Sequence, residues 1–375
     1  MSATESPKTS EAIVFRGPDQ PLQLEQLPLP DLKDQEVLVR VLCCTICGSD
    51  VHTFSGHRGT PVPTILGHEI LGEVVAIGPG AAIAGINGAT IELGMRVTWS
   101  VVAHCGDCFF CQRELPQKCL GLFKYGHRSL QPEHQLSGGL AEYCHLKAGT
   151  QLLPVPPHLP THVVTPANCA TATIAGAMRT AGSVTDCHLL VQGAGMLGLT
   201  AAAMASAAGA ASVVVTDISS ERLERARQFG ADHVVLMGGE GNALVETVAK
   251  VTDGHGMDVA IDVCGAAEAV QAGLDSLRIG GIQVLVGSVF PGPPLALDLE
   301  DVVRRMLTIR GLHNYTPADL VSAVEFLEEY HQQFPFGELV TSSYSLADVS
   351  SAFAAAADPR SLRIAVEPSS SFVHC

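Results

Sequence analysis

Basic residues are scarce in this chain of 375 residues. Lys and Arg together number 22 against 38 Asp and Glu, which gives a net charge of -16. That charge repels a phosphate backbone, so nucleic acid is excluded as an expected partner. Charged residues make up only 16% of the chain and hydrophobic residues 47%. A chain with so much apolar material is expected to fold rather than to remain disordered.

Long hydrophobic runs are also missing. No apolar run approaches the roughly 20 residues that a membrane helix requires, so no membrane span is expected. Residues 1–15 lack a basic region followed by an apolar core, unlike a signal peptide. We therefore expect a cytoplasmic protein. In that setting the 12 cysteines, several of which cluster with histidines, favour thiolate ligands over disulfides.

The length suits two domains, and the composition and apolar pattern of the sequence change from one to the other. Residues 1–170 are rich in Gly, Pro and short β-type runs, which predicts a mostly β domain of barrel-like character. In residues 171–315 apolar strands alternate with Ala-rich helical segments, which predicts an α/β domain with a doubly wound parallel sheet. Residues 316–375 are too few for a third domain, so we expect them to return to the first.

A glycine-rich turn follows the apolar strand predicted at residues 188–192. Its sequence, GAGMLG, leads directly into an apolar helix. The glycines allow a tight turn and the close approach of a pyrophosphate, which then lies at the positive end of the helix. The alternative is an ordinary tight turn between a strand and a helix. The predicted cofactor contacts in this turn are Gly193, Gly195, Met196, Leu197 and Gly198.

An acidic residue ends the next predicted strand. Asp217 lies 24 positions after Gly193, where a carboxylate can accept both ribose hydroxyls of an adenosine and repels a 2'-phosphate. This favours NAD over NADP. Arg222 follows closely and is included among the cofactor contacts, because a nearby arginine can instead favour the 2'-phosphate. Its helical repeat with neighbouring charged residues is also typical of a solvated face.

Four cysteines form a C-x2-C-x2-C-x7-C array, namely Cys105, Cys108, Cys111 and Cys119. Thiolates at such spacings can turn inward from one loop and share a tetrahedral zinc ion. Four protein ligands leave no open position, so the predicted zinc site is structural. The spacing alone does not exclude an iron–sulfur cluster.

Three other segments carry a second set of metal-type ligands. Residues 47–52 offer a thiolate, a hydroxyl, a carboxylate and an imidazole, and His68 stands next to Glu69. Cys169 is a third candidate, at the junction of the predicted domains. Three protein ligands leave a fourth position for water or substrate, as a catalytic zinc requires. Whether Cys169 or Glu69 completes this set stays open.

Taken together, these motifs resemble the zinc-containing alcohol dehydrogenases of the medium-chain dehydrogenase/reductase family. The resemblance covers nearly the whole chain. It implies a GroES-like catalytic domain that carries both zinc sites, a Rossmann domain that binds NAD, two zinc ions per chain, and a homodimer or homotetramer. The stretch 119–127 together with 165–173 resembles the branches that act on cyclitols or phosphonates.

The resemblance also implies a role for each site residue. Cys47, His68 and Cys169 would hold the catalytic zinc, with Glu69 behind it and able to exchange onto the metal. Asp50 would orient His68. Ser49 would bond the substrate oxygen and begin a proton relay that His52 completes. Arg363 would contact the cofactor pyrophosphate, the alternative being a surface salt bridge.

The expected reaction is oxidation of a primary or secondary alcohol of a small polar substrate, such as a polyol, a cyclitol or a hydroxyphosphonate. Two alternatives share the fold: a catalytically inactive or redox-regulatory nucleotide-binding protein, and a zinc-free reductase. Four further residues can be interpreted in two ways: they line the anion-binding rim of a pocket, or they belong to solvated loops. These are His57, Arg58, Lys124 and His127.

Overall fold

The computed structural model describes residues 8–239 and 242–368, and these form two compact units. The first unit comprises the chain up to Cys169, then Thr316–Glu328, and then the residues from Gly337 onward. The second unit comprises Ala170–Tyr315 and Glu329–Phe336. The chain therefore leaves the first unit twice, at Ala170 and at Glu329, and returns to it at Thr316 and at Gly337.

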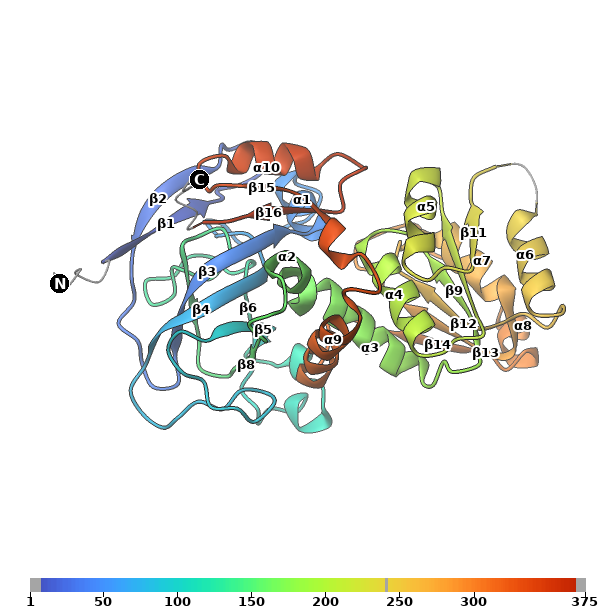
Figure 1. Cartoon of the computed structure of the whole chain (residues 1–375), viewed down its shortest axis with the longest axis horizontal. Helices are drawn as coiled ribbons and strands as arrows, with labels where there is room; N and C mark the ends of the chain where they lie inside the picture. Colours follow the sequence, from blue (N-terminus) through green and yellow to red (C-terminus); the bar gives the residue numbers. More distant parts are fainter. Residues whose placement is uncertain (1–7, 240–241, 369–375) are drawn as a thin grey trace. The chain divides into compact units, whose positions relative to one another are not determined.

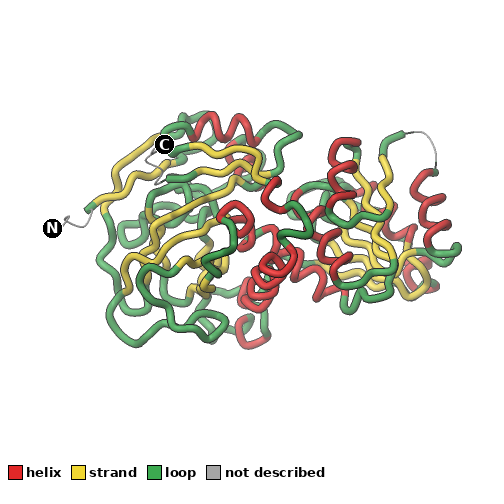
Figure 2. Tube along the Cα trace, in the orientation of Figure 1, coloured by secondary structure: helices red, strands yellow, loops and turns green. Residues whose placement is uncertain are grey.

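Strands and loops dominate the first unit (Figure 2). Its main sheet has the order β15-β16-β3-β4-β5-β6, with β7 paired to β3 and β8 to β5, while β1 and β2 form a separate antiparallel pair. The strands are β1 (Thr9–Val14), β2 (Gln23–Pro28), β3 (Val37–Ile46), β4 (Glu69–Ile77), β5 (Arg96–Ala103), β6 (Phe123–Lys124), β7 (Tyr143–Leu146), β8 (Thr150–Pro154), β15 (Val340–Tyr344) and β16 (Arg363–Val366). The helices are α1 (Gly48–Phe54), α2 (Thr161–Val164), α9 (Pro317–Tyr330) and α10 (Val349–Ala356), with short 3-10 turns η1 (Cys111–Arg113), η2 (Pro116–Lys118), η3 (Thr165–Asn168) and η4 (Phe336–Glu338).

A continuous apolar core holds this sheet together. The side chains of Val37, Val39 and Val41 alternate along β3 and are fully buried in it, as expected for a strand with a period of two residues. Trp99, the only tryptophan of the chain, lies at 0% exposure in the same core and meets Tyr125 edge to face. The β-branched and aromatic residues that predicted strands here are the ones that fill the interior.

The end of the chain adds two strands to the sheet of the first unit. β16 pairs antiparallel with β3, with Ile364 opposite Ile46, and β15 pairs with β16 (Figure 1). Residues separated by more than 300 positions therefore lie side by side. This register brings the first residue of β16, Arg363, next to the carboxyl end of β3.

The second unit is a parallel sheet with the order β11-β10-β9-β12-β13-β14. Its strands are β9 (His188–Gln192), β10 (Ser212–Asp217), β11 (His233–Leu236), β12 (Met257–Asp262), β13 (Leu277–Leu285) and β14 (Thr308–Gly311). Its helices are α3 (Ala170–Ala181), α4 (Met196–Ala207), α5 (Ser220–Gln228), α6 (Ala243–Val251), α7 (Ala267–Ser276) and α8 (Leu299–Arg304), which flank the strands in Figure 1. The strand order reverses between β9 and β12, and ligands of such sheets bind at that switch point.

The observed α/β fold, with a GroES-like mostly β part and a Rossmann-type parallel sheet, is the fold class that the sequence predicts. One strand is irregular. β13 begins at Leu277 and continues through Gly280 and Gly281, and its pairing with β12 shifts register between Met257 and Val259.

Two further findings concern possible membrane spans and the state of the cysteines. Within residues 8–239 and 242–368, no helix is long and apolar enough to cross a membrane. The cysteines in the same ranges are free thiols, as expected, so they are available as metal ligands.

Candidate active site and metal sites

Antiparallel pairing of β3 with β4 brings the first two candidate ligands together. Thr45, near the end of β3, lies opposite Glu69, the first residue of β4. Cys47 follows β3 as the N-cap of α1, and His68 directly precedes β4. Two motifs 21 positions apart therefore meet because one strand ends where the next begins.

Asp50 fastens these two segments to one another. Its Oδ2 accepts the backbone N–H of Cys47 at 3.0 Å, and its Oδ1 accepts from Nδ1 of His68 at 3.2 Å and from the backbone N–H of Gly67 at 3.3 Å. The carboxylate is almost completely buried. With Nδ1 of His68 donating to Asp50, Nε2 carries the lone pair and is the ligand atom, as in metal sites where a carboxylate orients the histidine.

Cys169 reaches the same place from the end of η3. Its neighbour Asn168 is fully buried, donates from Nδ2 to the carbonyls of His68 and Trp99, and accepts the backbone N–H of Ile70. Asn168 is not among the residues predicted from the sequence, where its only signal is its position next to a candidate ligand. Through these bonds Asn168 holds the loop before Cys169 against β4 and β5.

The ligand atoms of Cys47, His68 and Cys169 lie within 4.8 Å of one another. A hydrogen bond from Cys169, with the charge of Arg363, lowers the pKa of the Cys47 thiol against the effect of burial. Burial disfavours a charged imidazole, but Asp50 and Cys47 raise the pKa of His68 to about 10. The surroundings therefore stabilise positive charge between these groups, and thiolate and imidazole are ligands that zinc prefers. The residues fit a zinc ion.

Glu69 is held behind these ligands by a buried cation. Arg363 donates from Nε to Oε2 at 2.8 Å and from Nη2 to Oε1 at 3.0 Å, and Thr45 donates to Oε2 at 2.6 Å. Nη2 of Arg363 also lies 3.7 Å from Sγ of Cys47. Burial raises the pKa of Glu69 to about 7, while the charge of Arg363 opposes that rise. The surface salt bridge considered for Arg363 is wrong, because the pair is buried; its contact with a pyrophosphate stays a prediction.

Ser49 and His52 lie on α1, the helix that follows the ligand Cys47. Oγ of Ser49 is 3.4 Å from Nε2 of His68, and its side chain is half-buried. His52 lies almost one turn further along the helix and is exposed. A hydroxyl beside the ligand nitrogen and an imidazole in solvent are the ends that a proton path requires.

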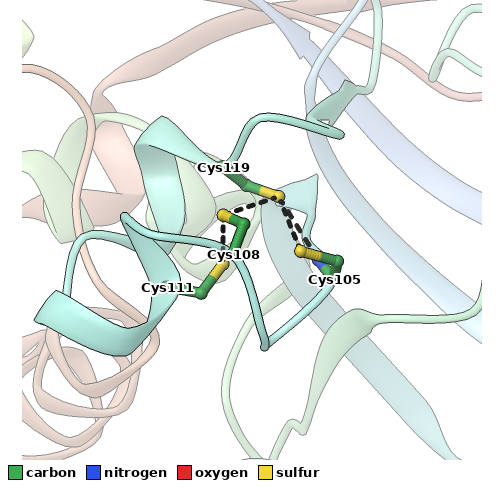
Figure 3. Close-up of side chains that lie close together, drawn as sticks. All are labelled: Cys105, Cys108, Cys111 and Cys119. Atoms are coloured by element: carbon green, nitrogen blue, oxygen red, sulfur yellow. Dashed lines mark hydrogen bonds between the residues drawn. The ribbon is translucent and has the colours of Figure 1, made fainter.

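The four cysteines of the array converge in a separate lobe (Figure 3). Sγ of Cys119 lies 3.4 Å from Sγ of Cys105 and 3.9 Å from that of Cys108, which lies 3.5 Å from Cys111. Two sulfurs on a tetrahedral zinc with bonds of about 2.3 Å are roughly 3.8 Å apart. The donor set fits one ion, whereas a cluster spreads its cysteines over several irons. Backbone N–H groups of Cys111 and Leu120 lower the pKa of Cys108 to about 6, which favours the thiolate.

The glycine turn occupies the loop between β9 and α4 at the switch point of the second sheet. Gly193 adopts a φ of 108°, and a Cβ on Gly198 would collide with the carbonyl oxygen of Gly193. Gly195, the N-cap of α4, is different, because a Cβ there would meet no atom within 4 Å. Gly193 and Gly198 are therefore required by the turn and its packing, whereas Gly195 leaves open space beside the backbone. The N–H groups of Met196 and Leu197 begin the helix there, which fits a pyrophosphate.

Asp217 ends β10 beside this turn. Its Oδ2 accepts the backbone N–H of Ala194 at 2.7 Å, and its Oδ1 accepts that of Ser219 at 2.8 Å. The carboxylate is thus fixed against the turn that would hold a dinucleotide. Arg222 lies in the first turn of α5, where its own N–H donates to Oγ of Ser219.

Two family models match the chain, one for each part. The alcohol dehydrogenase GroES-like domain matches residues 33–157, and the zinc-binding dehydrogenase model matches residues 197–329. Fold and donor groups define a zinc-binding, nucleotide-dependent oxidoreductase. The chain belongs to the zinc-containing medium-chain alcohol dehydrogenase family, whose structural four-cysteine and catalytic Cys-His-Cys sites correspond to the two groups above. It is therefore an enzyme, and the inactive and zinc-free alternatives lose their support.

Relatives with different substrates are similar to it over most of their length. A sorbitol dehydrogenase of Halalkalibacterium halodurans is 28% identical over 92% of this chain and 95% of its own. An L-threonine 3-dehydrogenase of Pyrococcus furiosus is 31% identical over 80% of this chain and 82% of its own. Among solved structures, an alcohol dehydrogenase of Thermotoga maritima superposes with a TM-score of 0.90 at 27% identity, covering 96% of this chain and 99% of that one.

Proposed function

We propose that this enzyme oxidises a primary or secondary hydroxyl of a small polar alcohol, with NAD as the hydride acceptor. The substrates considered are polyols, cyclitols and hydroxyphosphonates. The observation that carries the proposal is Oγ of Ser49 at 3.4 Å from the ligand nitrogen of His68, within a set of three ligands that leaves one position open. A substrate hydroxyl on that position lies within reach of Ser49.

Zinc, when bound, supplies a Lewis acid that makes the hydroxyl acidic near neutral pH. Cys47, His68 and Cys169 would hold it, and Cys105, Cys108, Cys111 and Cys119 would hold a second, structural ion. Asp50 accepts from Nδ1 of His68 and so fixes the orientation of the ring, which leaves Nε2 as the atom that would face the metal. Arg363 keeps Glu69 close behind the ligands, where its carboxylate is available as an alternative ligand.

Proton removal is assigned to α1. Ser49 accepts the proton of the substrate hydroxyl as its own hydroxyl proton passes toward His52, and His52 releases a proton to solvent. Both residues lie on α1, so the backbone fixes the distance between their Cα atoms.

NAD is favoured over NADP by the carboxylate of Asp217. Its two oxygens already accept backbone N–H groups, so the charge cannot turn away from a ribose placed beside the glycine turn. A 2'-phosphate would meet that charge at short range.

Metal analysis and a kinetic panel test this function. We expect about two zinc ions per chain and reduction of NAD with a polyol, a cyclitol or a hydroxyphosphonate. A stronger reaction with NADP than with NAD would contradict the role of Asp217. No reaction with any alcohol, in protein that carries both metals, would contradict the proposal as a whole.

A dimer, or a tetramer built from dimers, is the proposed assembly. The second sheet ends in the edge strand β14, and this strand and the 20 residues that lead along the chain into it carry several exposed large apolar side chains. They are Val289, Phe290, Leu295, Leu297, Leu299, Val303, Met306 and Ile309. An edge strand with apolar neighbours is a template for pairing with another chain, and a second copy of this chain satisfies both features.

A further inference from the structure

Two cations without an acidic partner lie beside the proposed catalytic ligands. Arg58 follows α1, and Lys124 ends the short strand β6, where it pairs with Val102 of β5. Both side chains are half-buried. Within the ranges that the structure describes, neither of them forms an ion pair within 4.0 Å. In a chain with a net charge of -16, two half-buried cations without an ion pair, both linked to His127, are unexpected.

A chain of contacts ties Arg58 to the catalytic centre. The ring of His127 lies 4.9 Å from the ring of His68, centroid to centroid. Nδ1 of His127 donates to the carbonyl of Tyr125 at 3.0 Å, so Nε2 bears the lone pair and accepts from Nη1 of Arg58 at 2.6 Å. His127 is therefore a neutral residue that positions the guanidinium one ring away from a metal ligand.

Lys124 belongs to the same segment as His127, because its carbonyl accepts the backbone N–H of His127 at 3.4 Å. Burial lowers the pKa of its ammonium group, the charge of Arg58 adds to that effect, and Cys169, Cys47 and Asp50 oppose it. His57, in contrast, is exposed in the loop before Arg58.

We propose that Arg58 and Lys124 bind a dianionic group of the substrate, and that the substrate is an alcohol carrying a phosphate or a phosphonate. This rests on the proposed function, since it names the substrate class of that site. Two cations match two negative charges, and the remaining N–H groups of Arg58 suit tetrahedral oxygens. A carboxylate offers only one charge, and a neutral polyol offers none.

Matched substrate pairs test the proposal with the full-length, zinc-loaded enzyme. Sorbitol is compared with sorbitol 6-phosphate, ethylene glycol with 2-hydroxyethylphosphonate, and glycolate serves as the carboxylate. We expect kcat/KM with NAD to be at least ~100-fold higher for the phosphate or phosphonate member of a pair, as two charge-assisted contacts allow. Equal or better use of the neutral members, or of glycolate, would overturn the proposal.

Single substitutions separate binding from structural effects. Arg58→Gln and Lys124→Met should each lower the ratio of kcat/KM between the charged and neutral member by roughly 10- to 100-fold, mainly through KM. Arg128→Gln is the matched control, because Arg128 is an exposed cation four positions after Lys124, and it should leave the ratio unchanged. If Arg58→Gln lowers kcat/KM equally for the charged and the neutral member of a pair, the cations only balance the charge of the ligand thiolates, and the proposal is wrong.

Direct binding distinguishes this proposal from the proposed function. Calorimetric titration with inorganic phosphate and with methylphosphonate should detect binding to the parent enzyme and to Arg128→Gln, and much weaker binding to Arg58→Gln. An enzyme that oxidises neutral alcohols but binds neither anion keeps its function and refutes the anion site. An enzyme that binds both anions through Arg58 but oxidises no alcohol retains the site and refutes the function.

Discussion

At the level of single residues, the catalytic centre depends on side chains that bind no substrate. Asp50 illustrates this, because its two oxygens bond to three partners that belong to Cys47, Gly67 and His68. Replacing Asp50 by Asn turns one carboxylate oxygen into an NH2 group, so at least one of these three N–H donors then faces another donor. Such carboxylates typically contribute about 10- to 100-fold to metal affinity.

We therefore expect Asp50→Asn to release its catalytic zinc roughly 10- to 100-fold more readily than the parent enzyme. Zinc transfer to a coloured chelator measures this directly, without an activity assay. The four-cysteine zinc of the same molecule serves as the control, because it lies in a separate lobe and should leave at the parental rate. If the variant and the parent released the catalytic zinc at the same rate, Asp50 would have no role in the metal site.

A buried histidine pair gives the first unit a dependence on pH. Nε2 of His145 donates to Oε2 of Glu36 at 2.9 Å, and Nδ1 of His134 lies 3.3 Å from Nδ1 of His145. Burial lowers the pKa of both histidines; Glu36 opposes this effect and the charge of Lys147 adds to it, and the net pKa shift of each is downward. The unfolded chain therefore takes up protons first. The stability of the unit should be complete above the ordinary histidine pKa of about 6.5 and decline as the pH falls below it.

His145→Gln should reduce that decline, since Gln keeps a donor for Glu36 but cannot take up a proton. The measurement is urea unfolding at about pH 7.5 and about pH 5.5, followed by the fluorescence of Trp99, which reports on the core of the first unit alone. His255→Gln, at an exposed position of the second unit, is the control and should behave as the parent does. A decline as steep in His145→Gln as in the parent would contradict this origin.

At the level of elements, the four-cysteine lobe has little to hold it except its ligands. Cys105 is exposed, Cys108 and Cys111 are half-buried, and only Cys119 is buried. Short 3-10 turns connect them, and large apolar side chains such as Phe109 and Leu120 point into solvent. A loop with so small a core gains its order from metal binding.

Cys108→Ser is therefore expected to lower the zinc content from about two ions per chain to about one and to expose residues 105–119 to proteases. Metal analysis and limited proteolysis check the two effects together. Cys187→Ser removes a half-buried thiol outside the array and should retain both ions and resist cleavage. Retention of two ions by Cys108→Ser would mean that the lobe is not a zinc site.

The elements also show what sequence reasoning can reach. The strand predicted at residues 188–192 is β9 with the same bounds, because the apolar pattern of a strand is a local signal. The ligand motifs were found for the same reason, since each lies within a few residues. Asn168, the Thr45–Glu69 bond and the burial of Arg363 were not found. They depend on the register between strands far apart in the chain, which no local pattern encodes.

At the level of the whole molecule, the apolar surface around β14 predicts self-association. Ile309 lies on the edge strand itself and Val303 is 73% exposed on the preceding helix. A charge on that edge should prevent pairing between sheets. We therefore expect Ile309→Lys to give a smaller particle than the parent protein.

Light scattering after size-exclusion chromatography measures this change in mass. Val245→Lys, which places the same charge on an exposed apolar position of α6, should keep the parental mass. A monomeric parent would contradict the proposed assembly, and an unchanged mass in Ile309→Lys would place the interface elsewhere.

The pairing of β16 with β3 has a consequence for the synthesis of the protein. Arg363, the partner of Glu69, stands 294 positions after it, so it leaves the ribosome last of the residues around the catalytic ligands. Until then the edge of β3 that β16 covers is open, and Glu69 has no cation beside it. A nascent chain therefore cannot complete this centre until its last strand has paired with β3.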